Sequence, residues 1–277
     1  MSRRWLITGS SRGLGRALAE AALAAGHRVI ATARDPRALA DLVDRYGDAV
    51  RPIALDVTDP EAAARAVALA VEAFGGLDVV VNNAGYGDIG SVEDTSLEDF
   101  RKQIEANLFG TIIVTKAAIP LLREQGAGRF LQLSSVGGRR GAPGRAAYSA
   151  AKWAVEGFSE VLAQEMALVG VKVTIVEPGG FRTDFAGAST RLDPGRPEYD
   201  AVVGAAARMQ ARYDGKQPGD PRRAAQVLLQ VAAMDEPPLR LPLGSDAIAA
   251  ISAADQQRLA ELERWGALSA STDFEVS

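Results

Sequence analysis

The chain alternates short apolar runs rich in β-branched residues with alanine-rich segments of helical periodicity as far as about residue 178. The predicted strands are 5–8, 28–33, 50–55, 78–81, 129–133 and 171–176, and the predicted helices are 14–25, 36–45, 60–74, 97–107 continuing through 109–122, and 147–169. Continuously apolar strands that alternate with helices form a parallel sheet covered on both faces. Right-handed crossovers then give a doubly wound, three-layer α/β fold of the Rossmann type.

Beyond residue 178 the pattern loosens. Residues 179–197 hold Gly, Pro, Asp and Thr between aromatic residues, which predicts a long loop, and loops of this length in compact domains usually have a function. Helices are predicted at 198–213, 220–234 and 246–265, a strand at 240–243, and a frayed end at 269–277. Without internal repeats or low-complexity linkers, we predict one domain over 1–277, with 179–215 as a substrate lid and 237–277 as a C-terminal extension.

Composition excludes several classes of function. The chain has 47% hydrophobic and 24% charged residues with a net charge of −4, so it offers no basic field for nucleic acid or an anionic membrane. It has no cysteine and one histidine, which argues against thiolate chemistry and metal sites. No uninterrupted apolar run reaches the ~18 residues of a membrane span, and Arg3 and Arg4 lead directly into the first strand. We expect a soluble cytoplasmic protein without a signal peptide.

A glycine-rich turn follows the first predicted strand. Residues 8–15 read Thr-Gly-Ser-Ser-Arg-Gly-Leu-Gly and lead into a helix, whose free N–H groups can bind phosphate. Three residues separate the first two glycines, unlike the G-x-G-x-x-G fingerprint, and no Gly-Lys-Ser/Thr ending marks a Walker loop. Such a turn can be purely structural, but its place at the first strand-to-helix corner favours a nucleotide.

Tyr148 and Lys152 lie four residues apart on the long helix 147–169, and therefore on one face. A fixed ammonium group favours the phenolate of a tyrosine. Lowering the tyrosine pKa from about 10 to near 7 requires about 4 kcal/mol. A tyrosine tuned in this way can exchange a proton with an alcohol oxygen. Taken alone, the pair is more often a packed tyrosine beside a solvated lysine.

Six motifs together resemble the short-chain dehydrogenase/reductase family in order and spacing over about residues 3–185, and they favour its single-domain branch. They are the turn 8–15, Asn-Asn-Ala-Gly at 82–85, Asn107, Ser134-Ser135, Tyr148 with Lys152, and Pro178-Gly179. The resemblance implies hydride transfer between a nicotinamide cofactor and an alcohol or carbonyl compound. It implies that Asn107, Ser135, Tyr148 and Lys152 are the catalytic residues, Asn107 holding a water that links Lys152 to solvent. Ser135 is preferred to Ser134 as the catalytic serine because its separation from Tyr148 along the sequence is the one found in the family.

The resemblance also implies the binding residues. Those for the cofactor are Gly9, Ser11, Arg12, Gly13, Leu14, Arg34, Asp56, Val57, Asn83, Ala84, Gly85, Tyr148, Lys152, Pro178, Gly179 and Thr183. Asp56 and Val57 could equally form an ordinary turn at a strand end. A hydrophobic substrate is predicted from an apolar pocket of Ser135, Val136, Tyr148, Phe181 and Phe185, with Tyr86 and Leu192 nearby. These aromatic residues could equally pack a lid against the core.

Charge indicates the choice of cofactor. An acidic residue at the end of the second strand would select NAD, whereas arginine accommodates a 2′-phosphate. That position is Ala33, followed by Arg34, and Arg12 lies in the glycine turn. Asp35 is the counter-evidence, but we expect it to cap the next helix. We therefore predict NADP(H), unless Arg34 is only a solvated surface charge.

The C-terminal part departs from many members of the family. It has Pro-Pro-Leu-Arg-Leu-Pro at 237–242 and a final helix, and looks more like the retinol and steroid dehydrogenase side. A homodimer through the helices at 111–122 and 155–168, or a homotetramer, is predicted. The alternatives to an oxidoreductase are a dinucleotide-binding sensor without catalysis, and an isomerase or dehydratase that uses hydride transfer transiently.

Overall fold

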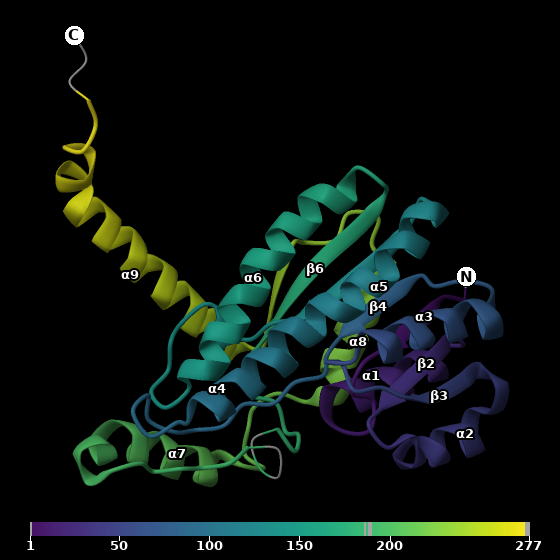
Figure 1. Cartoon of the computed structure of the whole chain (residues 1–277), viewed down its shortest axis with the longest axis horizontal. Helices are drawn as coiled ribbons and strands as arrows, with labels where there is room; N and C mark the ends of the chain where they lie inside the picture. Colours follow the sequence, from purple (N-terminus) through teal and green to yellow (C-terminus); the bar gives the residue numbers. More distant parts are fainter. Residues whose placement is uncertain (1, 186, 188–189, 275–277) are drawn as a thin grey trace.

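The computed structural model describes residues 2–185, 187 and 190–274, and its centre is a parallel sheet (Figure 1). The strand order is β3-β2-β1-β4-β5-β6-β7. The strands are β1 (Arg4–Ile7), β2 (Arg28–Ala33), β3 (Val50–Ala54), β4 (Val79–Asn82), β5 (Gly128–Leu133), β6 (Val171–Pro178) and β7 (Arg240–Leu243). All seven predicted strands form, with ends that differ by at most two residues from the prediction. The doubly wound α/β fold is confirmed.

Helices cover both faces of this sheet. They are α1 (Gly13–Ala24), α2 (Ala40–Tyr46), α3 (Pro60–Phe74), α4 (Leu97–Ile104), α5 (Gly110–Gln125), α6 (Ala146–Ala167), α7 (Ala205–Tyr213), α8 (Pro221–Ala233) and α9 (Ser245–Ala270). Side chains of a strand alternate between faces, so Trp5 and Ile7 pack in one core cluster with α1, α2 and α8. Leu6, between them, packs in the other cluster with α3, α5 and α6. These are the three predicted layers.

The helix predicted at 36–45 begins differently. Residues Pro36–Leu39 form a 3₁₀ turn, η1, and only then does α2 start. Asp35 caps the turn, because its carboxylate accepts a hydrogen bond from the Arg37 backbone N–H (3.0 Å). The first turn closes with a short-range bond from Ala38 N to Asp35 O (3.3 Å). The expected capping role of Asp35 is confirmed.

A long helical stretch runs through α4, a π turn η3 (Glu105–Phe109) and α5. The π turn contains Asn107, where the sequence predicted an interruption. Residues 97–125 are long and apolar enough to cross a membrane by length and composition alone. A single helix of this kind is weak evidence for a membrane span. About a third of its most apolar window (33%) is buried, and α5 packs against α3 while α4 packs against α6.

The segment after β6 is more structured than a plain loop. Leu192 forms a β-bridge with Ile89, and the two side chains pack with Val203 and Ala207 in a small third cluster. The helix predicted at 198–213 is a 3₁₀ turn η5 (Pro197–Tyr199), a π turn η6 (Asp200–Gly204) and α7.

The final helix is longer than predicted. It runs over Ser245–Ala270 rather than 246–265, because Gly266 is accommodated inside the helix and does not end it. Figure 1 shows α9 leaving the body of the molecule beside α6. Of the end predicted to fray, residues 275–277 lie outside the described part, and helix occupies 269 and 270.

Candidate active site

The strand order reverses between β1 and β4, and ligands of open α/β sheets bind beyond the carboxyl ends of the strands at such a point. The loops after β1, β4, β5 and β6 all leave the sheet at this edge. Nearly all of the predicted site residues belong to these loops, to the end of β2 and to the start of α6.

The glycine turn is built for close approach of backbone atoms. Gly9 and Gly13 have φ of 67° and 61°, which disfavours side chains. A Cβ on Gly15 would lie 2.4 Å from both the Gly9 carbonyl oxygen and Asn83 Nδ2. Asn83 Nδ2 donates to the carbonyl oxygens of Thr8 (2.9 Å) and Gly9 (3.2 Å). Asn83 therefore fastens the glycine turn to β4.

The two arginines predicted to contact a 2′-phosphate are both exposed. Arg12 is the N-cap residue of α1, and its side chain makes no capping hydrogen bond. Neither Arg12 nor Arg34 forms an ion pair or a side-chain hydrogen bond with another residue of the described ranges. Asp35, in contrast, is bound to the Arg37 guanidinium (2.8 Å). At the end of β2, Arg34 is therefore free of an ion pair within the described residues, whereas Asp35 is not.

Asp56 and Val57 follow β3. The Asp56 carboxylate accepts hydrogen bonds from the Thr58 backbone N–H (3.0 Å) and hydroxyl (2.8 Å). These bonds, with the charge of Arg34, lower the pKa of Asp56 although its partial burial opposes them. Val57 packs closely against Gly110, where an added Cβ would lie 2.5 Å from Val57 Cγ2. The pair forms an ordered turn beside Arg34.

The other predicted cofactor residues lie on the same loops. Thr183 sits against the glycine turn, with its Cβ 3.5 Å from where a Cβ on Gly13 would be. The Gly179 N–H donates to the Leu243 carbonyl oxygen (2.9 Å) and the Ala84 N–H to Thr8 Oγ1 (3.0 Å). Leu14 packs against the core, and Ser11, Gly85 and Pro178 complete the set.

Tyr148 and Lys152 lie on the first turns of α6 and are 7% and 4% exposed. Lys152 Nζ is 5.8 Å from the centre of the Tyr148 ring and donates to the Leu133 carbonyl oxygen (2.7 Å). Ser135 faces the phenol from the end of β5: a Cβ on Gly137 would lie 3.1 Å from Tyr148 Cε1 and 3.5 Å from Ser135 Oγ. The three side chains are therefore gathered around one small space.

Asn107 is fully buried in the π turn. Its Nδ2 donates to the carbonyl oxygens of Tyr86 and Gln103 (both 2.8 Å), whereas Oδ1 has no partner among the described residues. A Cβ on Gly85 would lie 2.4 Å from this oxygen and 3.7 Å from Lys152 Nζ. An unpaired buried acceptor beside an ammonium group suits a bound water.

Burial controls the two central pKa values. It raises the pKa of Tyr148 above its ordinary value, while the contact with Ser135 and the charge of Arg145 lower it. It lowers the pKa of Lys152 to about 8, against a small opposing effect of Glu156. The net lowering of the Tyr148 pKa that the sequence predicted is therefore wrong for the protein alone, because burial outweighs the groups that lower it. The reason is that the phenol and the ammonium both lose water.

The predicted substrate residues divide into two groups. The Phe185 ring lies 5.6 Å from the Tyr148 ring, centre to centre, at 55°. Val136 follows Ser135 directly in the 3₁₀ turn η4 (Val136–Gly138). Phe181 instead packs on the core cluster and against Gly219, and Leu192 belongs to the third cluster described above. Of the predicted substrate residues, Phe185 is the apolar one whose side chain is shown to lie against Tyr148.

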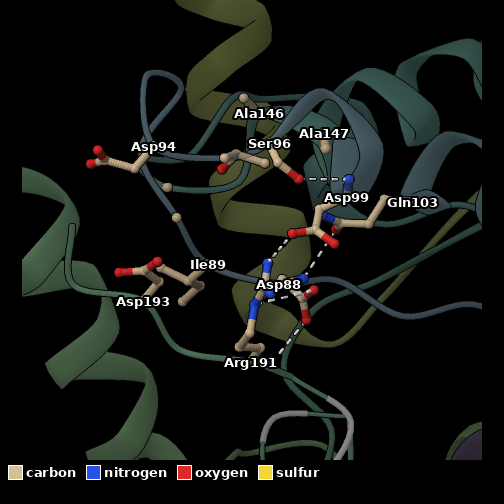
Figure 2. A pocket seen from close by; sticks show the side chains of 13 residues that line it. Asp88, Ile89, Asp94, Ser96, Asp99, Gln103, Ala146, Ala147, Arg191 and Asp193 are labelled. Carbon is tan, nitrogen blue, oxygen red and sulfur yellow. Dashed lines mark hydrogen bonds and ion pairs between the residues drawn. The ribbon is translucent and has the colours of Figure 1, made fainter. Parts of the chain in front are cut away.

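A cavity of about 190 Å³ lies beside the start of α6 (Figure 2). Its lining includes Asp88, Asp94, Asp99 and Asp193, and does not include Ser135 or Tyr148. Arg191 bridges two of these carboxylates, with Nη2 3.0 Å from Asp99 and the backbone N 2.8 Å from Asp88 (Figure 2). In this polar cavity, Asp88 and Asp99 bind Arg191, which belongs to the predicted lid. The cavity is not the apolar pocket that the sequence predicted.

The sequence-based prediction missed two residues near the site. Arg145 lies three residues before Tyr148, a helical spacing that could have indicated a shared face. Asp246, in the first turn of α9, accepts a hydrogen bond from the Gly180 N–H (2.7 Å) at the root of the lid. Nothing in the sequence could have indicated that contact, because it joins residues 66 positions apart.

Comparisons with known proteins agree with this geometry. The family model for short chain dehydrogenases matches residues 3–193. Oxidoreductase BOA17 of Botryotinia fuckeliana is 50% identical over 270 residues, covering 97% of this chain and 98% of that protein. The crystal structure of a short-chain dehydrogenase from Streptomyces avermitilis has a TM-score of 0.93 at 42% identity, covering 99% of this chain and all of the other.

A further similar structure contains a dinucleotide. It is an alcohol dehydrogenase of the archaeon Thermococcus sibiricus complexed with 5-hydroxy-NADP, with a TM-score of 0.71 and 28% identity, covering 88% of this chain and 96% of the other. The match to the family model runs from β1 through the glycine turn to the residues after β6. On this evidence, the chain belongs to the short chain dehydrogenase family of oxidoreductases.

Proposed function

We propose that the protein is an NADP(H)-dependent oxidoreductase that interconverts a hydrophobic ketone or aldehyde and its alcohol, with Tyr148 as general acid and base. The observation that carries the proposal is the gathering of Ser135, Tyr148 and Lys152 around one space. This space lies at the sheet edge where the glycine turn offers room for a phosphate. We also propose that the protein is cytoplasmic and folds as a single domain, with residues 179–215 as a lid over the substrate. It forms a homodimer or a homotetramer.

The residues at this edge fit a dinucleotide. The glycine turn leaves backbone N–H groups at the start of α1, where no acidic residue or side-chain cap competes for them. The unpaired guanidinium groups of Arg12 and Arg34 suit a 2′-phosphate. Asp35, which would favour a free 2′-hydroxyl, is already bound to Arg37. When bound, the nicotinamide supplies or accepts the hydride.

The chain's own residues handle the proton. In the reduction direction, the hydroxyl groups of Ser135 and Tyr148 hold the carbonyl oxygen, which becomes more negative as reaction proceeds. Burial raises the Tyr148 pKa and keeps the phenol protonated at neutral pH, ready to donate. Lys152, with a pKa of about 8, is mainly charged at pH 7 and stabilises the phenolate left behind. A water bound at Asn107 Oδ1 supplies the proton that restores the Tyr148 phenol.

The test is consumption of NADPH with a panel of ketones and aldehydes graded by size and polarity. Among the neutral compounds of the panel, we expect turnover to be fastest with the more apolar ones, and NADPH to be preferred to NADH in kcat/KM. A tenfold preference for NADH would contradict the choice of cofactor. Binding of NADPH without turnover of any carbonyl compound would favour the sensor. Product formation without a net change in NADPH absorbance would favour the isomerase or dehydratase.

A further inference from the structure

An arginine stands beside the proposed general acid. Arg145 is the N-cap residue of α6, and its guanidinium carbon lies 5.8 Å from the centre of the Tyr148 ring. Its Nη1 donates to the Gly87 carbonyl oxygen (2.9 Å). A Cβ on Gly87 would lie 2.7 Å from Tyr148 Cδ2 and 3.1 Å from Arg145 Nη1. Glycine at position 87 therefore lets the phenol and the guanidinium come together.

Arg145 is partly buried and has no carboxylate within ion-pair distance among the described residues. Three other partly buried arginines, Arg139, Arg191 and Arg240, all form ion pairs. The carboxylate that acts on Arg145 from further away is that of Asp88, which already accepts a hydrogen bond from the Arg191 N–H. Burial lowers the pKa of Arg145. A desolvated cation without a counter-ion is unfavourable, so it requires another reason to be there.

The free edge of this guanidinium has a defined shape. Nη1 is fixed by Gly87, whereas Nε and Nη2 have no hydrogen-bond partner in the described part of the chain. Two parallel N–H groups of this kind match the two oxygens of a carboxylate. Gly144, Ala146 and Ala147 line the acidic cavity of Figure 2, but Arg145 between them does not. Its guanidinium is on the side of Gly87 and Tyr148 instead.

We propose that Arg145 is a specificity-determining residue that binds a carboxylate of the substrate through its Nε–Nη2 edge. The preferred substrates are then oxo acids and hydroxy acids whose apolar body lies against Phe185 and whose reacting oxygen lies at Ser135 and Tyr148. This inference rests on the proposed function and narrows its substrate class. The substrate carboxylate supplies the counter-ion that the described part of the chain does not provide for Arg145.

The test compares acids with their neutral esters. The probes are 4-oxopentanoate, 5-oxohexanoate and 4-acetylbenzoate, each with its methyl ester, and NADPH as the reductant. We expect the wild-type kcat/KM to be at least tenfold higher for one or more of the acids than for its ester. Arg145→Gln removes this preference by raising KM for the acid, while KM for the ester changes less than twofold. Arg145→Lys keeps part of the preference, since it retains the charge without the planar fork.

The matched control is Arg140→Gln, which removes an exposed arginine from the same connection between β5 and α6 and leaves the preference unchanged. Calorimetric titration with 4-ethylbenzoate, which cannot be reduced, gives a readout independent of turnover. The wild type binds it at least tenfold more tightly than Arg145→Gln does. Equal affinities would overturn the inference.

Other outcomes separate the inference from the proposed function. Arg145 also lies near the phenol, together with Lys152 and Ser135, and Asp88 faces the arginine from the loop after β4. If Arg145→Gln slows acid and ester equally and shifts the pH profile of kcat/KM, Arg145 acts on Tyr148 and the inference fails. If neutral ketones are reduced without any preference for acids, the inference fails and the proposed function stands. If no carbonyl compound is reduced, the proposed function itself fails.

Discussion

Lys152 is the residue at which function and stability conflict most directly. Its ammonium is buried and, among the described residues, donates to a single acceptor, the Leu133 carbonyl oxygen (2.7 Å). Burial lowers its pKa from 10.5 to about 8. Below pH 8 the folded and unfolded chains both carry the proton, so the cost of burying the charge is fully present, about 3 kcal/mol. Between pH 8 and 10.5 the unfolded chain binds more protons, and stability rises with pH.

We expect Lys152→Met to abolish turnover and to stabilise the protein without cofactor by about 2 kcal/mol at pH 7, because the buried charge is removed. The lost hydrogen bond to Leu133 reduces the gain by about 1 kcal/mol. The difference between variant and wild type shrinks as pH rises from 8 to 10.5. Urea unfolding at pH 7 and pH 10 measures it. A variant less stable than wild type at pH 7 would contradict the assigned cost.

The positions of the site residues could be predicted from sequence better than their ionisation. Tyr148 and Lys152 share a helix face because of their spacing, and Ser135 follows a strand that ends at the same sheet edge. The direction of the Tyr148 pKa could not be predicted, because it depends on how completely the lid and α6 exclude water. Phe181 and Phe185 are equally aromatic and four residues apart, and only the packing decides that Phe185 faces Tyr148.

At the scale of elements, the glycine turn between β1 and α1 is the most tightly constrained connection. A Cβ on Gly15 would meet a backbone oxygen and the Asn83 amide, neither of which can move without opening the turn. Gly157 is a matched position in the middle of α6, where an added Cβ meets nothing within 4 Å. Comparing the same substitution at the two glycines therefore distinguishes a steric requirement for glycine from the effect of helix propensity.

We therefore expect Gly15→Ala to destabilise the fold by about 1–3 kcal/mol through overpacking and to weaken NADPH binding at least tenfold. Gly157→Ala should stabilise the protein by up to about 1 kcal/mol, because alanine is the better helix former, and leave NADPH binding unchanged. Thermal unfolding and fluorescence titration with NADPH measure both effects. The steric account fails if Gly15→Ala binds NADPH as well as wild type does.

Strand β7 pairs with β6 and also brings Arg240 to two buried carboxylates. Arg240 Nε lies 3.1 Å from Glu156 and 3.4 Å from Glu177, and Glu177 is fully buried. Burial and the neighbouring Glu177 raise the pKa of Glu156, although Ser134 and the arginines oppose this. Both carboxylates depend on Arg240 and, for Glu177, on Arg139 (2.8 Å).

Arg240→Met should destabilise the protein by about 3 kcal/mol at pH 7, because removal of one partner leaves buried charge uncompensated. Lys172→Met on the adjacent strand β6 is the control: it breaks an ion pair with Glu236, which is 86% exposed, and should change stability by less than about 1 kcal/mol. Chemical denaturation of both variants tests the difference. Equal effects would show that the buried charges on α6 and β6 are neutralised by other means.

The elements themselves were largely predictable, and their exceptions have local causes. The alternation of continuously apolar strands with helical segments predicted the sheet and its layers, and the helix predicted at 60–74 forms with those bounds as α3. The π turn at Asn107 could be predicted only as an interruption, because its form depends on the bonds from Nδ2 to Tyr86 and Gln103. The full length of α9 could not be predicted, because a glycine such as Gly266 is typical of a helix end.

At the scale of the whole molecule, apolar side chains remain exposed on the helices. Val161 on α6 is 54% exposed and Leu168, directly after α6, is 87% exposed, and both belong to the segment 155–168 that is predicted to take part in a dimer. On α9, Leu262 and Trp265 are also exposed along the part that leaves the body (Figure 1). Contiguous exposed apolar patches mark interaction surfaces. The predicted oligomer through α5 and α6 can therefore be distinguished from association through α9.

The double substitution Val161→Glu and Leu168→Glu should convert the oligomer to monomers, because it places charges in the predicted interface. Leu262→Glu, a substitution of the same kind on α9, should leave the oligomer intact. Size-exclusion chromatography with light scattering gives the masses, and circular dichroism checks that the folds are retained. Dissociation caused by Leu262→Glu alone would place the interface on α9 instead.

The central claim is that Tyr148, held between Ser135 and Lys152, transfers the proton during reduction of a carbonyl compound. The most direct measurement compares Tyr148→Phe with wild type in two assays, fluorescence titration with NADPH and the initial rate of NADPH oxidation with the best carbonyl substrate. We predict an unchanged dissociation constant for NADPH and a loss in kcat of about 10³-fold, within the range that a general acid contributes. A Phe variant with kcat within tenfold of wild type would contradict the account.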